Sequence, residues 1–114
     1  MASIEERVLQ PGETLHVPYL FDLEVLQAFR RRALKRELTG QRAGEALEDF
    51  AALDVVRYPH LPLMERIWTL RSNVSAFDAA YLALAEALDA PVVTADAKLA
   101  RAPGHRARIE LYAL

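Results

Sequence analysis

Three acidic residues, Glu24, Asp78 and Asp96, lie within or beside apolar segments of this 114-residue sequence. Asp78 is near the start of "NVSAFDAAYLALAEAL", Asp96 follows "PVVTA", and Glu24 follows a short apolar stretch. Carboxylates held within a few ångströms of one another repel, and a hard divalent cation removes that conflict. The sequence has no Cys, and no His stands beside these acids, so the ligands would be oxygens that suit Mg²⁺ or Mn²⁺ rather than zinc. Such a cation is well matched to phosphodiester hydrolysis.

The spacing of apolar residues predicts the elements that would position these acids. We expect strands over 14–20, 54–59, 91–96 and 108–114, longer helices over 22–38, 41–53, 61–71 and 75–88, and short helices near 4–9 and 98–101. Alternating strands and helices predict a single α/β domain, residues 1–114, with a parallel sheet covered on both faces. In right-handed βαβ units each helix begins where the preceding strand ends. The three acids should therefore share the carboxyl edge of the sheet, where open α/β folds bind ligands.

Helix capping is the alternative interpretation of each acid. Ser75 and Asp78 have the S-x-x-D spacing of a capping box. Asp96 would cap the short helix that follows it, and Glu24 would favour the positive end of a helix whose N-cap is Asp22. Capping does not explain why carboxylates, rather than Ser or Asn, occur in all three places. The two interpretations remain open at this level.

The composition excludes several classes of protein. A hydrophobic content of 53% with 26% charged residues is typical of a globular chain and excludes wholesale disorder. The net charge of −2 argues against coating nucleic acid by bulk electrostatics. The first nine residues lack the apolar run of a signal peptide, and no long uncharged apolar segment follows. The expected location is the cytoplasm.

The basic, histidine and aromatic side chains elsewhere in the sequence are explained by surface exposure or packing. The basic clusters over 30–36 and 101–108 are either solvated faces or local contacts for nucleic acid. The three histidines are scattered without ligand spacing and are expected to be structural or on the surface. Trp68 is expected in the core or a dimer interface, and Tyr81 and Leu82 in packing contacts.

Several motifs resemble those of a known family. "PYLFDLEVLQAFRR" resembles the second acidic motif of the PIN-domain toxins of the VapC family. "LRSNVSAFDAAYLALAEALDAPVVTADAKLA" resembles their third and fourth motifs together, and "APGHRARIEL" is similar to their usual ending. The resemblance implies a PIN-like three-layer α/β/α sandwich. It also implies a Mg²⁺- or Mn²⁺-dependent endoribonuclease that is the toxin of a type II toxin–antitoxin pair.

The resemblance also implies roles for particular residues and partners. Glu24, Asp78 and Asp96 would be the catalytic, metal-binding acids, with Asn73 and Thr94 as polar groups that orient ligands. The implied partners are an RNA substrate, a cognate antitoxin and a second copy in a homodimer. The basic cluster over 30–36 would guide RNA, meet acidic residues of an antitoxin, or contact only water.

The sequence departs from the family pattern at its beginning. Family members start with a short apolar strand that ends in the first metal-binding Asp, and no such segment precedes "ASIEERVLQPGE". We therefore expect a gap between two halves of the sheet, and weak or no activity for the chain as written. Robust Mg²⁺-dependent RNA cleavage that Asp78→Asn abolishes would contradict this expectation.

Two other functions remain as alternatives. One is a catalytically inactive PIN-like module that binds an antitoxin or dimerises. The other is a receiver-like phosphoacceptor domain, which is disfavoured because it needs a Lys at the end of a late strand, where this sequence has Thr94 and Asp96.

Overall fold

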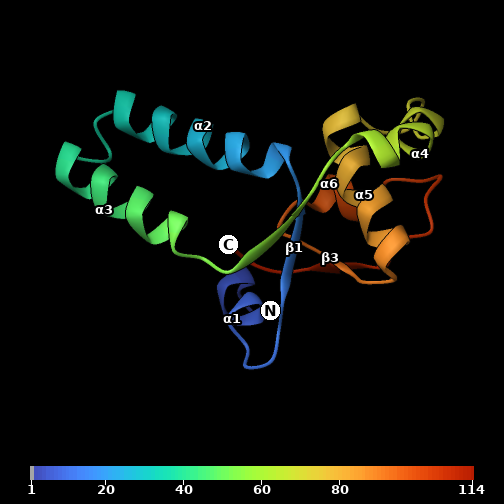
Figure 1. The fold of residues 1–114 in the computed structure, drawn as a ribbon, viewed down its shortest axis with the longest axis horizontal. Coiled ribbons are helices and arrows are strands. Elements are labelled where there is room, and N and C mark those ends of the chain that lie inside the picture. Colours follow the sequence, from blue (N-terminus) through green and yellow to red (C-terminus); the bar gives the residue numbers. More distant parts are fainter. Residues whose placement is uncertain (1) are drawn as a thin grey trace.

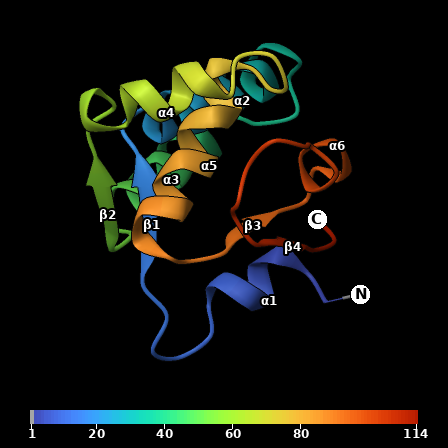
Figure 2. The same ribbon diagram turned by 90° about the vertical axis from the view of Figure 1, so that its right-hand side faces the viewer.

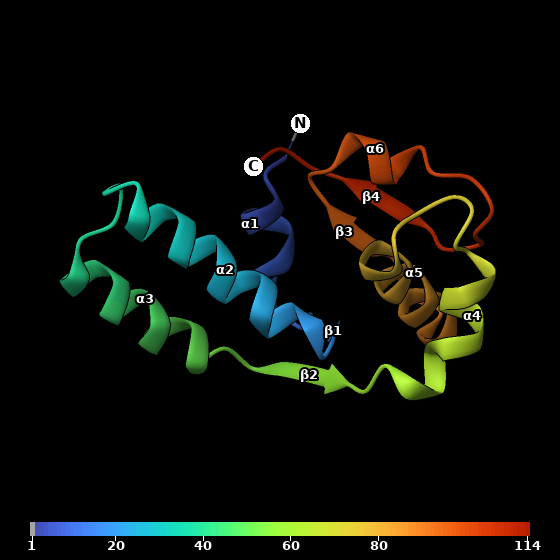
Figure 3. The ribbon, with the colours of Figure 1, turned by 90° about the horizontal axis from the view of Figure 1, so that it is seen from above.

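Short strands lie between a helical hairpin on one side and a group of helices on the other in the computed structural model, which describes residues 2–114 (Figure 1). The elements are α1 (Ile4–Val8), β1 (Leu15–Pro18), α2 (Leu20–Leu34), α3 (Gly40–Ala51), β2 (Val55–Tyr58), η1 (Leu61–Leu63), α4 (Met64–Thr69), α5 (Ala76–Leu88), β3 (Val92–Thr94), α6 (Ala97–Ala100) and β4 (Ile109–Leu111). The hairpin of α2 and α3 extends away from the other helices, and the molecule measures 42 × 29 × 24 Å (Figure 3).

The described strands form two separate parallel pairs. β1 pairs with β2, Leu15 opposite Val55, and β3 pairs with β4, Val92 opposite Ile109. The expected α/β class with parallel strands is confirmed. Among residues 2–114 no ladder joins the two pairs, which agrees with the expected gap between two halves of the sheet. Figure 2 shows β1 and β3 on opposite sides of this gap, with α5 running beside both.

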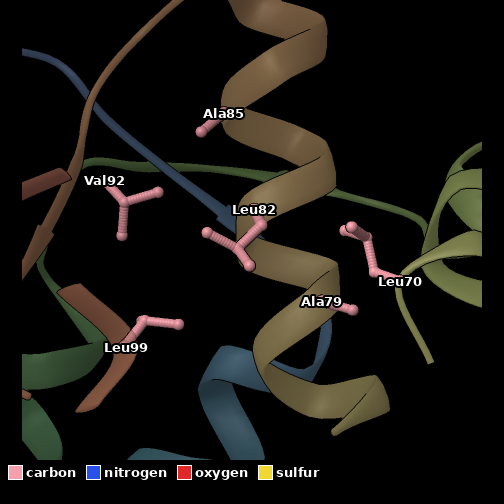
Figure 4. Packing of buried hydrophobic residues seen from close by; sticks show 6 residues of the cluster. All are labelled: Leu70, Ala79, Leu82, Ala85, Val92 and Leu99. Atoms are coloured by element: carbon pink, nitrogen blue, oxygen red, sulfur yellow. The ribbon is translucent and has the colours of Figure 1, made fainter. Parts of the chain in front are cut away.

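Helix α5 forms the centre of the core. Ala79, Leu82 and Ala85 recur along one face of the helix, at the spacing that an amphipathic helix uses to face its neighbours. In Figure 4 they face Val92 and Leu99 on one side and Leu70 on the other. Ser75 caps the helix, and Asp89 ends it in the left-handed conformation, with φ of 50°. The expected helix over 75–88 and the buried position of Leu82 are thus confirmed.

The start of α2 differs from the expectation. The helix begins at Leu20 with Tyr19 as its N-cap residue, so the prediction that Asp22 is the N-cap is wrong. The Nε–H of Arg57 in β2 instead donates a bifurcated hydrogen bond to the two Asp22 carboxylate oxygens, at 2.8 and 3.0 Å. The Asp22 side chain thus pairs with Arg57, 35 positions away in the sequence, instead of accepting a backbone N–H as a helix cap. The helix also ends earlier than expected, at Leu34.

Trp68 is 67% exposed, with the guanidinium of Arg71 stacked 4.7 Å from its ring centroid, so its expected place in the core of this chain is wrong. A place in a dimer interface stays a prediction.

Within residues 2–114, no helix has the length and apolar character needed to cross a membrane.

Candidate functional site

Asp78 lies in the first turn of α5, where Ser75 is the N-cap residue. The Ser75 hydroxyl oxygen accepts the Asp78 backbone N–H at 3.2 Å. Among the described residues, no hydrogen bond from the Ser75 N–H to the Asp78 carboxylate completes a capping box, whereas Ser3 and Glu6 of α1 make both bonds. Burial raises the pKa of the half-buried Asp78 carboxyl and the negative charge of Asp96 raises it further, whereas the Ser75 side chain lowers it by hydrogen bonding, and the pKa is raised overall. Asp78 and Asp96 are therefore close enough to repel each other.

Asp96 is both a helix cap and a member of this acidic pair. Its Oδ1 accepts the backbone N–H groups of Lys98 at 2.9 Å and Leu99 at 3.3 Å, so the capping interpretation is confirmed for this residue. The hydroxyl oxygen of Thr94, at the end of β3, accepts the Asp96 backbone N–H at 3.0 Å. These bonds fix the direction of the side chain and engage only one of its two carboxylate oxygens. The other oxygen is available to a ligand.

Glu24 reaches the same region from α2. Its Oε1 accepts a hydrogen bond from the hydroxyl group of Tyr81, which lies on α5 one turn after Asp78. Burial raises the pKa of Tyr81 above its usual value, and the bond to Glu24 and the charges of Glu24 and Asp78 raise it further. The negative charges of Glu24 and Asp78 thus both act on the same hydroxyl group.

The surroundings of the three acids favour a bound cation over ion pairs within the protein. Within residues 2–114, none of the three forms an ion pair with Lys, Arg or His, although Asp22, Glu86 and Glu110 each do. The ligand set of carboxylate oxygens, with two like charges in mutual repulsion, suits a hard divalent ion. However, no three Asp, Glu, His or Cys side chains in this part of the chain form a group that could hold a metal ion. The structure brings Asp78 and Asp96 together and links Glu24 to them through Tyr81.

Asn73 and Thr94 have different surroundings. Thr94 supports Asp96 directly, as described above. Asn73 lies against Gly104 in the loop before β4, where a Cβ added to Gly104 would be 2.1 Å from the Asn73 amide nitrogen. No hydrogen bond joins the Asn73 side chain to the acids within the described residues. Its role as a ligand-orienting group stays a prediction.

The close approach of Gly104 to Asn73 leads to a stability prediction. We expect Gly104→Ala to lower the free energy of unfolding by about 2–3 kcal/mol, because the new methyl group would overlap Asn73 and because φ is +91°. Urea unfolding followed by circular dichroism measures the change. Gly44→Ala in α3 is the matched control, since a Cβ there meets nothing within 4 Å, and it should stabilise by about 0.5–1 kcal/mol. Equal effects of the two variants would contradict the prediction.

Sequence reasoning missed Tyr81 as part of the site. An aromatic residue in an apolar helix is usually a packing residue, and its side chain is indeed partly buried. The signal that would have found it is its spacing of three residues from Asp78, which places both side chains on one helix face. Its partner, Glu24, lies 57 positions away in the sequence, so only the fold identifies the contact.

Parallel strand pairs, with carboxylates on α2, at the start of α5 and shortly after β3, are features of the class of α/β protein to which the PIN domains belong. Residues 2–105 match the PIN domain family, so the chain belongs to that family. It is similar to ribonuclease VapC1 of Mycobacterium tuberculosis, 46% identical over 111 residues, covering 96% of this chain and 84% of the relative. Ribonuclease VapC9 of the same organism is 46% identical over 95 residues, covering 83% and 75%. Ribonuclease VapC12 is 40% identical over 102 residues, covering 90% and 79%.

Proposed function

We propose that this protein is a metal-dependent endoribonuclease, the toxin component of a type II toxin–antitoxin system. The observation that carries the proposal is the pair of Asp78 and Asp96, two mutually repelling carboxylates without a basic partner among residues 2–114. The names of the similar ribonucleases support the same activity. Such a toxin acts on RNA in the cytoplasm.

The ligands support Mg²⁺ or Mn²⁺ as the metal. A bound ion of this kind activates water and neutralises charge on the phosphate during phosphodiester hydrolysis. Asp78 and Asp96 would hold the ion, and Glu24 would contribute from α2. Thr94 keeps Asp96 in place by accepting its backbone N–H. The basic residues at the end of α2, Arg31, Arg32 and Lys35, would attract the RNA backbone.

The partners belong to the same proposal. Leu23, Leu26 and Leu34 are exposed on α2, and Leu47 is exposed on α3. Apolar side chains gathered on one protruding hairpin are typical of protein interfaces. This surface supports both a homodimer and the binding of a cognate antitoxin.

A second candidate function is a catalytically inactive PIN-like module that keeps these binding surfaces. It is favoured by the finding that no three potential ligands in residues 2–114 form a single group. The same finding supports weak rather than robust RNA cleavage by this chain. Calorimetric titration with Mn²⁺ separates the candidates. Binding that is lost in Asp96→Asn supports the enzyme, and the absence of binding to the unmodified chain supports the module.

Asp78→Asn is expected to remove metal binding without lowering the stability of the metal-free protein. It should abolish Mn²⁺ binding and the remaining RNA cleavage, because Asn has no charge to hold the ion. It should also leave the metal-free protein at least as stable at pH 7. The raised pKa means that folding disfavours the ionised carboxylate, and that cost, which grows as pH rises through the pKa, is absent in Asn. Calorimetry, cleavage of a labelled RNA and thermal unfolding without metal measure these effects.

Asp89→Asn is the matched control for that variant. Asp89 is exposed at the end of α5 in a left-handed conformation that Asn also adopts readily. The control should leave Mn²⁺ binding unchanged. Retention of tight Mn²⁺ binding by Asp78→Asn would contradict the proposed site.

A further inference from the structure

Tyr81 stands at the junction of the two helices that carry Glu24 and Asp78. It lies between buried Ala80 and Leu82 on α5, yet its hydroxyl group reaches outward to the exposed carboxylate of Glu24 on α2. Its position, three residues after Asp78, places it one turn further along the same helix face. A rigid and partly buried ring thus presents a single donor to a flexible acidic side chain.

The position of Glu24 depends on such contacts because the hairpin has little core of its own. No residue of α2 or α3 is buried, and the far end of the hairpin projects away from the rest of the molecule (Figure 1). Three side chains from outside the hairpin make polar contacts to the start of α2: His60 to the N–H of Leu20, Arg57 to Asp22, and Tyr81 to Glu24. Of these, the contact made by Tyr81 comes from the helix that carries Asp78.

We propose that Tyr81 is a positioning residue that holds Glu24 in register with Asp78. Its hydroxyl group engages one oxygen of Glu24 and directs the carboxylate toward α5, and the second oxygen then remains for a cation. This inference rests on the proposed function, since it assigns Tyr81 a role at the same metal site. Groups that orient metal ligands commonly change metal affinity by about 10- to 100-fold when they are removed.

Tyr81→Phe tests the inference because it removes the hydroxyl group and keeps the ring. We expect the Mn²⁺ affinity of the full chain, measured by calorimetry at pH 7, to fall about tenfold. Tyr112→Phe is the matched control, since Tyr112 donates to Glu110 at 2.7 Å on β4 and should leave Mn²⁺ affinity unchanged.

A double-mutant cycle distinguishes positioning from a general structural role. If Tyr81 acts through Glu24, Tyr81→Phe should have no further effect on Mn²⁺ affinity in a Glu24→Gln background. A loss of equal size in both backgrounds would overturn the role of Tyr81, as would unchanged affinity in Tyr81→Phe alone. If the unmodified chain binds Mn²⁺ clearly, either of these results leaves the proposed function intact. A failure of the unmodified chain to bind Mn²⁺ would overturn the proposed function and this role together.

Discussion

Replacement of Glu86 by Ala is expected to lower the free energy of unfolding by about 3–5 kcal/mol, because it leaves a partly buried guanidinium without its partner. Arg66 on α4 donates two hydrogen bonds to Glu86 on α5, at 2.7 and 3.0 Å, and the backbone N–H of Arg106 donates a third at 2.6 Å. The Glu86 side chain is only 8% exposed. This carboxylate therefore joins α4, α5 and the loop before β4. Urea unfolding at pH 7 measures the loss.

The matched control is an exposed ion pair. Arg42 and Glu45 on α3 are paired with side chains 68% and 43% exposed, and Glu45→Ala should change stability by less than about 0.5 kcal/mol. If Glu86→Ala proves as mild as Glu45→Ala, Glu86 does not connect these elements as described.

The same ion pair predicts how stability depends on pH. The hydrogen bonds from Arg66, with further help from the Arg106 N–H, lower the pKa of Glu86 from 4.5 to about 2. A lowered pKa in the folded state contributes stability that is complete above the unfolded-state pKa and is lost as pH falls. About 3 kcal/mol should therefore disappear between pH 4.5 and pH 2. Glu86→Gln should show a smaller acid dependence over this window, and an unchanged profile would contradict the assignment.

Local patterns in the sequence explain which parts of the fold could be predicted. Helix α5 was predictable because a Ser cap, an apolar face and a turn at Asp89 all occur within the segment itself. Parallel pairing was predictable because strands alternate with helices. The bounds of α2 and β4 were not, because the ends of helices and strands depend on contacts with distant residues. For the start of α2, those contacts are the hydrogen bond that Asp22 accepts from Arg57 and the one that the Leu20 N–H donates to His60.

The candidate site was predictable only in part for the same reason. The positions of Asp78 and Asp96 follow from the rule that helix starts and strand ends share an edge, and their electrostatic coupling supports it. The rule does not specify how far Glu24 lies from them. That distance is set by the contacts at the start of α2. One of them is the hydrogen bond that Tyr81 on α5 donates to Glu24.

The split sheet gives α5 an unusual importance for stability. In most parallel sheets the strands bond across the whole sheet, and covering helices add burial to an already continuous layer. Here no ladder joins β1 to β3 within residues 2–114, and α5 packs against both strands. Burial against α5, rather than hydrogen bonding between strands, therefore connects the two halves. Substitutions on its buried face should weaken both halves together.

Leu82→Ala is the sharpest test of this connection. Leu82 is fully buried, with Val92 and Leu99 on one side and Leu70 on the other (Figure 4). A Leu→Ala change in such a place costs about 3–5 kcal/mol through lost burial and the cavity left behind. Because a chain of this size has only about 5–15 kcal/mol of total stability, the variant should be close to unfolding. Unfolding in urea, followed by circular dichroism and by protection of backbone amides, measures this loss.

The two halves should lose stability in one transition, because the cavity lies on the helix that both of them contact. Amides of β1 and of β3 should therefore lose protection to the same extent in Leu82→Ala. Leu61→Ala is the matched control: Leu61 is 73% exposed, and its truncation should change stability by less than about 0.5 kcal/mol. If β3 loses protection while β1 keeps it, α5 does not couple the halves, and the stability of the β1–β2 half must come from the α2–α3 hairpin instead.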